Sequence, residues 1–127
     1  MSGVVGVGID LVDVARLASA IGRRRGIAQR VFTDVERSTA ATGARRDERL
    51  AARFAAKEAT MKALGVGLGA FAFRDVEVVT DDAGRPSLVL HNGAQAVASR
   101  LGVTSLSVSL THTAAMASAV VVAEGRP

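Results

Sequence analysis

The chain has 127 residues, 49% of them hydrophobic and only 3% aromatic, which suits one domain with a thin core and leads us to expect apolar surface buried between subunits. It has no cysteine, so disulfides, thiolate catalysis and cysteine-based zinc sites are excluded. Its two histidines lie far apart in the sequence, which disfavours a histidine-rich metal site. The formal net charge of +4 favours anionic partners such as phosphates, nucleic acid or an acidic protein.

The first predicted elements are a strand and a helix. Residues 3–12 (GVVGVGIDLV) are apolar, β-branched and glycine-rich, which predicts a buried strand that ends near Asp10. Residues 13–25 carry apolar side chains at helical spacing. Asp13 is the expected N-cap of this helix, and arginines occupy its C-terminal end, where the helix dipole favours positive charge.

Two further helices are predicted in the middle of the chain. The segment FTDVERS places Thr33 and Glu36 at the spacing of a capping box, which predicts a short helix there. Residues 39–48 are small and polar and predict a loop. The strongest helical pattern covers 48–65, which is rich in alanine, leucine, lysine and glutamate and has Gly65 as its C-terminal cap.

The remaining sequence alternates between strand and helix patterns. In chain order it predicts a flexible connection at 65–73, a hairpin of strands 74–80 and 87–91 around the turn 81–86, a helix at 93–103, and a last hairpin of strands 106–112 and 116–124. Hairpins mixed with separate helices indicate an α+β fold. We therefore expect a single domain over 1–127, with a mostly antiparallel sheet and packed helices.

The start of the chain gives no sign of export or of membrane insertion. The segment MSGVVGVGIDLV lacks a basic start, and Asp10 interrupts its short apolar run, so it does not match a signal peptide. No stretch approaches the roughly 20 apolar residues that span a bilayer. We therefore expect a soluble, cytoplasmic protein without a membrane partner.

The only two lysines of the chain lie on either side of Glu58 in the predicted helix 48–65. On a helical wheel the core face spans an arc of roughly 80° and is formed by Leu50, Phe54, Met61 and Leu64. Lys57 falls inside this arc, so its ammonium group must snorkel, pair, or meet a bound anion. Glu58 and Lys62 lie beyond one edge, one turn apart, and Arg53 lies near the other. Glu58 and Lys62 form either an exposed ion pair or part of a site that binds a metal-bound phosphate.

A magnesium site would need one further carboxylate, because Mg²⁺ takes one or two protein carboxylates plus substrate phosphate. Asp10 is the candidate, since it ends a strand with apolar residues on both sides and is therefore not a core residue. The alternative is an aspartate that only ends the strand or caps a helix. The nearby glycines raise a nucleotide-loop alternative, but GVGIDL lacks the third glycine of G-x-G-x-x-G and the chain has no G-K-[ST], so we reject it.

Five motifs, in this order, are GVGIDLVDVARL, FTDVE, RFAAKEATMKALG, GRP and SLTH. Together they resemble, from end to end, the holo-[acyl-carrier-protein] synthases, the small bacterial class of 4′-phosphopantetheinyl transferases. The combination of GID with F-x-x-K-E-A-x-x-K-A is specific. The resemblance implies the 4′-phosphopantetheinyl transferase fold and transfer of the 4′-phosphopantetheine arm of coenzyme A to a serine of apo acyl carrier protein, releasing adenosine 3′,5′-bisphosphate. It also implies dependence on Mg²⁺ and a homotrimer with active sites at the subunit boundaries.

The same resemblance implies roles for individual residues. Asp10 and Glu58 would be the Mg²⁺ ligands, with Lys62 as the third catalytic residue holding the diphosphate; the serine's base would be Glu58 or a metal-bound water that it orients. The implied coenzyme A contacts are Arg53, Lys57, Lys62, Gly84, Arg85, Pro86 and His112, the last from a neighbouring subunit. The implied carrier-protein contacts are Arg16, Arg23, Arg24 and Arg25.

Some positions are less determined by the resemblance. Larger relatives have a second acidic residue where this chain has Val12, so a water would fill that coordination slot. Arg45 and Arg46, in the predicted loop, are further candidates for phosphate contacts. His112 is alternatively a partly exposed strand-end histidine, and the arginine cluster alternatively a solvated helix end.

Two rival functions remain at this stage. A basic nucleic-acid-binding module without catalysis would account for the charge, but the chain has no tyrosine or tryptophan for stacking and no known reader motif, so we expect no nucleic-acid partner. The second rival is a catalytically silent scaffold protein of the same fold, which would not require Mg²⁺.

Overall fold

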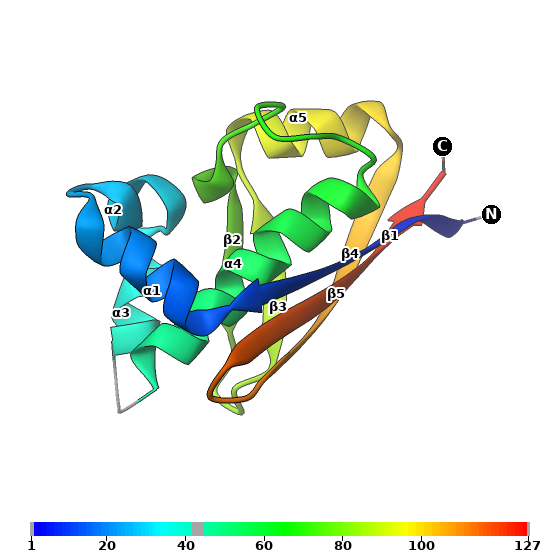
Figure 1. Ribbon diagram of the computed structural model, residues 1–127. Coiled ribbons are helices and arrows are strands. Elements are labelled where there is room, and N and C mark those ends of the chain that lie inside the picture. Colours follow the sequence, from blue (N-terminus) through cyan, green and yellow to red (C-terminus); the bar gives the residue numbers. More distant parts are fainter. Residues whose placement is uncertain (1, 42–44, 127) are drawn as a thin grey trace.

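The computed structural model describes residues 2–41 and 45–126. Its elements are β1 (Gly3–Asp13), α1 (Val14–Arg23), α2 (Ile27–Val31), α3 (Asp34–Ala41), α4 (Arg46–Ala63), the 3₁₀ turn η1 (Phe73–Asp75), β2 (Val76–Thr80), β3 (Pro86–Leu90), α5 (Asn92–Arg100), β4 (Val103–His112) and β5 (Met116–Gly125). Helix α4 lies across the larger of two antiparallel sheets, as Figure 1 shows. The predicted α+β architecture is therefore confirmed. In the described ranges, no helix combines the length and the apolar character needed to cross a membrane.

The larger sheet has the strand order β1-β5-β4, so the two chain-terminal strands pair with each other. Within this register Asp10 of β1 lies opposite Ala119 of β5, and Ser118 lies opposite Thr111 of β4. Alternate residues of β5 point inward and are small, namely Ala117, Ala119, Val121 and Ala123. These small side chains leave room for α4 against the inner face of the sheet.

Two glycines of β1 bring α4 into direct contact with the strand backbone. A Cβ atom added at Gly8 would lie 1.8 Å from the carbonyl oxygen of Ala59, and one at Gly6 would lie 1.9 Å from that of Ala63. Any side chain at either position would therefore push the helix away from the strand. The glycines of the GVGID motif consequently serve close helix–strand packing, in agreement with the rejection of a nucleotide loop.

The smaller sheet pairs β2 with β3, and Val78 lies opposite Leu88. It lies beside α4 on the side away from β1, with α5 above it (Figure 1). The inward residues Val76 and Val78 join the main core, whereas Phe32, Ala40 and Leu50 form a second buried cluster between α3 and α4.

The predicted caps of α1 and α3 are confirmed, but several boundaries differ, and β1 continues to Asp13 instead of ending near Asp10. Asp13 caps α1 by accepting a hydrogen bond from the Arg16 backbone nitrogen at 2.9 Å. Thr33 and Glu36 form the reciprocal capping box, with bonds of 2.9 and 3.2 Å. The short helix α2 was not predicted, because five residues are too few to show a helical period. The predicted loop 39–48 is also wrong at both ends, since α3 continues to residue 41 and α4 begins at residue 46; residues 42–44 of that prediction lie outside the described part of the chain.

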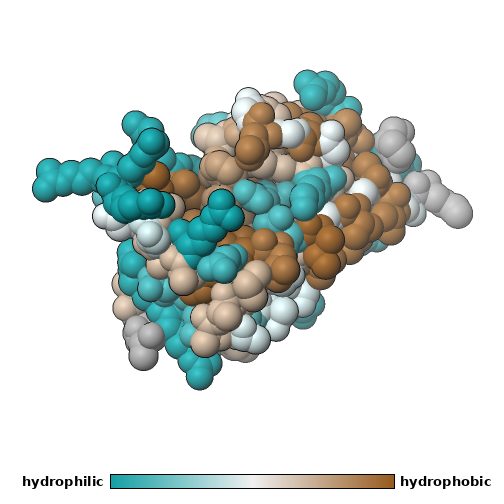
Figure 2. Space-filling view, viewed as in Figure 1, coloured by the Kyte–Doolittle hydropathy of each residue, from teal (hydrophilic) through white to brown (hydrophobic). Residues whose placement is uncertain are grey.

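The outward face of β1 carries large apolar side chains that none of the described residues covers. Val7, Ile9 and Leu11 are 58%, 63% and 65% exposed. They lie opposite Val122, Val120 and Ser118 of β5. Figure 2 shows hydrophobic residues following the path of β1 across the surface, while hydrophilic residues gather over α1 and α2. A continuous apolar strand face of this kind is typical of a surface that is buried in an assembly.

Candidate active site

Two carboxylates, Asp10 of β1 and Glu58 of α4, lie at the contact between strand and helix. The pKa of Glu58 is raised to about 7, first by burial and then by the adjacent Asp10 carboxyl, while Lys62 acts in the opposite direction. Both carboxylates line one pocket of about 470 Å³. Glu58 also lines a second, more apolar pocket of about 220 Å³ together with Lys62. The sequence predicted these three residues as a unit, and the structure brings them together.

Lys62 joins the helix to the strand from the rim of this site. Its ammonium group donates to the backbone carbonyl of Ile9 at 2.9 Å and lies 3.2 Å from Asp10 Oδ1. The Lys62 side chain is 56% exposed and that of Asp10 only 11%. The lysine therefore has one proton left for a further anion, in contrast to a simple ion pair between Glu58 and Lys62 along one helix face.

The oxygen atoms of this site fit a hard divalent cation. Asp10 Oδ2 is buried and has no hydrogen-bond partner among the described residues. A buried carboxylate oxygen without a partner is costly unless another species satisfies it. No cluster of three or more metal-binding side chains occurs in the described ranges. Two carboxylates alone match Mg²⁺, which completes its shell with water and substrate phosphate.

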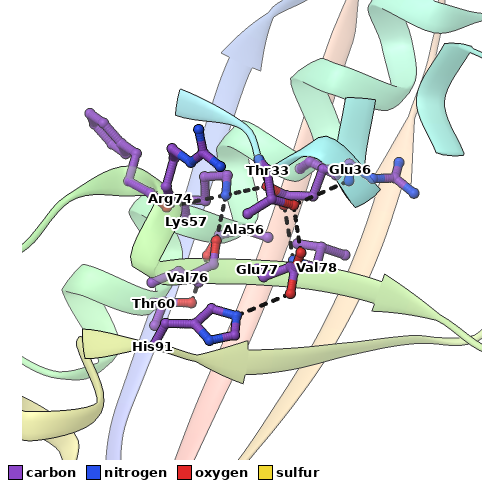
Figure 3. Close-up of polar contacts among 12 residues, drawn as sticks. Thr33, Glu36, Ala56, Lys57, Thr60, Arg74, Val76, Glu77, Val78 and His91 are labelled. Carbon is purple, nitrogen blue, oxygen red and sulfur yellow. Dashed lines mark hydrogen bonds and ion pairs between the residues drawn. The ribbon is translucent and has the colours of Figure 1, made fainter. Parts of the chain in front are cut away.

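Lys57 does not reach this site, which corrects its assignment as a coenzyme A contact. Its side chain is fully buried, and the Nζ atom donates to Glu36 Oε1 at 2.7 Å, to the Phe73 carbonyl at 3.1 Å and to the Val76 carbonyl. All three of its protons are thus used inside the protein (Figure 3). Of the three alternatives that the helical wheel left open, pairing is the one observed, and the ammonium has no proton left for a ligand.

Glu36 is the residue that sequence reasoning placed only as a helix cap. It is fully buried, and besides Lys57 its carboxylate accepts hydrogen bonds from the backbone nitrogens of Thr33 and Val78, each at 2.9 Å. The sequence does indicate that Lys57, on the core face of a helix, needs a buried partner. It does not identify Glu36 as that partner, because the two residues are 21 positions apart and meet only through non-local packing.

Arg53 is also more buried than the wheel suggested, at 6% exposure. Its Nη1 atom donates to the Arg49 carbonyl at 3.2 Å, and burial is the main cause that lowers its pKa. It does not line either pocket that contains Glu58. The charge of Glu36 acts in the opposite direction and raises the pKa of Arg53.

The other predicted coenzyme A contacts lie apart from the two carboxylates within one chain. Gly84 and Arg85 lie in the tight turn between β2 and β3, and Pro86 begins β3. The backbone nitrogen of Arg85 donates to the Asp81 carboxylate at 2.9 Å. His112 ends β4, and its Nδ1 atom lies 2.9 Å from Glu48 Oε2. The pockets that contain Glu58 are lined by neither the turn nor His112.

The arginines of α1 are divided between two surfaces. Arg16 lines the pocket shared by Asp10 and Glu58. Arg23 and Arg24 line a separate, open pocket with Ala20 and Ile27. Arg45 and Arg46 line a third one beside Glu48, the neighbour of His112. Of these arginines, Arg16 is the one that lines the pocket of the two carboxylates.

A model of the 4′-phosphopantetheinyl transferase superfamily matches residues 6–119, and the chain belongs to this family. Its relatives include proteins named holo-[acyl-carrier-protein] synthase, for example that of Frankia casuarinae, which is 52% identical over 95% of this chain and 98% of that protein.

Solved structures of proteins with the same name share the fold. A Bacillus anthracis structure in complex with coenzyme A (3′,5′-ADP) superimposes with a TM-score of 0.79 at 34% identity, covering 97% of this chain and 98% of that one. A Helicobacter pylori structure in complex with coenzyme A gives a TM-score of 0.81 at 30% identity, covering 92% and 98%. The family suggested by the sequence motifs is therefore confirmed, and with it the assignment of the chain as a transferase.

Proposed function

We propose that the chain transfers the 4′-phosphopantetheine arm of coenzyme A to a serine of apo acyl carrier protein and releases adenosine 3′,5′-bisphosphate, with Mg²⁺ bound by Asp10 and Glu58. The observation that carries the proposal is the pair of adjacent carboxylates, one with an unpartnered buried oxygen, beside an exposed lysine. The names of the relatives and the coenzyme A in two related structures support the substrate assignment.

In the proposed reaction the serine oxygen forms a bond to the β-phosphorus of coenzyme A, and the bond from that phosphorus to the oxygen bridging to the α-phosphate breaks. Lys62 binds the diphosphate from the rim, where its ammonium is half exposed. Glu58, or a metal-bound water that it orients, would take up the serine proton. A bound Mg²⁺ would supply neutralisation of the phosphate charge. Asp10 holds its carboxylate in place through its strand position and its contact with Lys62.

We further propose that a complete site needs more than one copy of the chain. The 84–86 turn and His112, both proposed to contact coenzyme A, do not line the carboxylate pockets of their own chain. A neighbouring copy packed on the apolar outer face of β1 would bury Ile9 and Leu11, which flank Asp10 in the sequence. The edge of the carboxylate site would then lie at the subunit boundary, as in the homotrimer that the family resemblance implies.

The carrier protein is proposed to dock on α1. Arg16 lies in the pocket of the carboxylates, and Arg23, Arg24 and Arg25 continue the positive surface at the helix end. If this surface binds an acidic carrier, reversing Arg16 and Arg24 to glutamate raises KM for the carrier far more than KM for coenzyme A. Binding of the carrier protein to the wild-type surface should also weaken as the salt concentration rises. Equal changes in both constants would point to a folding defect and count against docking there.

The decisive experiment is a mass measurement of apo carrier protein after incubation with the enzyme, coenzyme A and Mg²⁺. Transfer adds about 340 Da to the carrier serine. The Asp10→Ala variant, folded by circular dichroism, serves as the negative control. A carrier mass that stays unchanged with the wild-type enzyme would reject the proposed function.

A further inference from the structure

We propose that the buried pair Glu36–Lys57 is a positioning device for the carboxylate site: it fixes the rotation of α4 about its axis and thereby the position of Glu58 opposite Asp10. The inference rests on the proposed function, in which Asp10 and Glu58 bind the metal ion. It assigns a role in the reaction to two residues that touch neither of the two carboxylates.

The contacts between α4 and β1 depend on which residues of the helix face the strand. The helix presents Ala59 and Ala63 to the strand, and the strand presents Gly6 and Gly8. These close contacts admit only small groups, so a rotation of α4 that brought a larger side chain against Gly6 or Gly8 would push the helix away from the strand. Lys62 adds a directional bond to this contact, because its half-exposed ammonium donates to the Ile9 carbonyl.

The opposite side of α4 is fixed by hydrogen bonds that have defined directions. Lys57 donates from α4 to the carbonyl oxygens of Phe73 and Val76, at the entry to the smaller sheet. Glu36 joins this lysine to the start of α3 through the Thr33 nitrogen. Its second carboxylate oxygen accepts from the Val78 nitrogen, within β2. Figure 3 shows these bonds meeting around Lys57, so that three elements hold one point of the helix.

Lys57 directly precedes Glu58, and successive helix residues diverge by about 100°. A small rotation of α4 that moves Lys57 therefore moves Glu58 by a similar amount. Buried ion pairs with complete hydrogen bonding add little net stability, but they select one arrangement of their elements. The Lys57 ammonium also lies 5.6 Å from the ring centroid of Phe32, among apolar groups where a neutral side chain would pack without directional bonds.

The test is the double variant Glu36→Gln/Lys57→Met, which removes both charges without leaving either one buried alone. The matched control is Leu50→Ala, which loosens the same α3–α4 contact without touching the pair. Each folded protein is titrated with Mn²⁺ by electron paramagnetic resonance in the presence of coenzyme A and without carrier. The values of kcat and KM for transfer to the carrier are then measured.

A positioning role predicts that the double variant loses about 10–100-fold in Mn²⁺ affinity and in kcat, the usual effect of removing groups that orient metal ligands. The Leu50→Ala control should keep both values within about twofold of wild type once its unfolded fraction is corrected. Wild-type Mn²⁺ affinity and kcat in the double variant would overturn the proposal, and so would equal losses in the control.

A second variant keeps the test decisive if the double variant does not fold. Glu36→Asp retains the charge but withdraws the carboxylate by one methylene, so Lys57 must follow it or lose its partner. The proposal requires a smaller loss of Mn²⁺ affinity in the same direction, and an unchanged affinity would overturn it. Because the Mn²⁺ titration does not depend on transfer, a wild-type protein that binds Mn²⁺ but modifies no carrier would reject the proposed function and leave the positioning role to be decided by the titration.

Discussion

Helix α4 carries two lysines five residues apart, and each pairs with a carboxylate of another element. The two pairs differ in burial and in hydrogen bonding. Lys57 and Glu36 are both fully buried, and each makes three hydrogen bonds to the protein. Lys62 and Asp10 each line a pocket together with Glu58, and their side chains are 56% and 11% exposed. One oxygen of Asp10 has no hydrogen-bond partner among the described residues. The same two chemical groups thus form a closed structural unit on one side of the helix and an open one on the other.

The difference shows how an interior pair can be separated from a functional one without reference to any ligand. Burial of a charge is tolerated where every donor and acceptor is satisfied, as around Lys57. An unsatisfied carboxylate oxygen is tolerated where another species completes it, as the proposed Mg²⁺ would do for Asp10. Satisfaction of hydrogen bonds, rather than the presence of an ion pair, therefore distinguishes the two lysines.

The largest expected effect comes from the open side. Replacing Glu58 by Gln removes a proposed metal ligand and proton acceptor, so transfer should fall by about 10²–10⁴-fold. The fold should survive, because the substitution also removes one of two adjacent carboxylates. The measurements are the mass assay on the carrier and a thermal unfolding curve. Activity near wild type in the presence of Mg²⁺ would remove Glu58 from the mechanism.

The closed side should show its effect in stability. Lys57→Met leaves Glu36 as a buried carboxylate without its cation and should lower the free energy of unfolding by about 3–5 kcal/mol. Lys62→Met breaks the half-exposed pair and should cost about 0–1 kcal/mol. Urea unfolding at pH 7 measures both. Equal losses in the two variants would mean that the contrast between the pairs does not exist in solution.

The sequence predicts this contrast in part. The helical wheel already places Lys57 within the core face and Glu58 and Lys62 outside it, because both facts depend only on the local helical period. The partner Glu36 is not predictable in this way, since its capping-box role explains it locally and its second role requires α3 to pack on α4. The proximity of Asp10 and Glu58 likewise depends on a long-range contact. The glycines of β1 allow a helix to pack closely on the strand, but they do not determine which helix it is.

The close contact of Gly8 with α4 allows the geometry of Asp10 and Glu58 to be changed while both carboxylates are kept. Gly8→Ala should destabilise the protein by about 1–3 kcal/mol, because both the strand and the helix backbone must move to admit the methyl group. Transfer should fall as well, since the shift separates Asp10 from Glu58. Gly3→Ala is the matched control, because a Cβ atom at Gly3 meets nothing within 4 Å. A Gly8→Ala variant as stable and active as Gly3→Ala would refute the close packing.

The smallest effect is a pH dependence of stability from Glu58. Its folded-state pKa of about 7 lies above the ordinary value of 4.5, so between these values the folded protein binds more protons than the unfolded one. Wild-type stability should therefore fall, relative to Glu58→Gln, as pH rises from 4.5 to above 7. Solvent screening of this half-exposed group limits the difference to below about 1 kcal/mol.

Unfolding midpoints of both proteins across this range, with a chelator present, measure the effect, and a constant difference would contradict it. Added Mg²⁺ should then raise the wild-type midpoint at pH 8 more than that of Glu58→Gln, because a ligand that binds only the folded state stabilises it. The repulsion between the adjacent carboxylates of Asp10 and Glu58 would thus be the cost of keeping a cation site open, a cost that the fully satisfied pair around Lys57 does not carry.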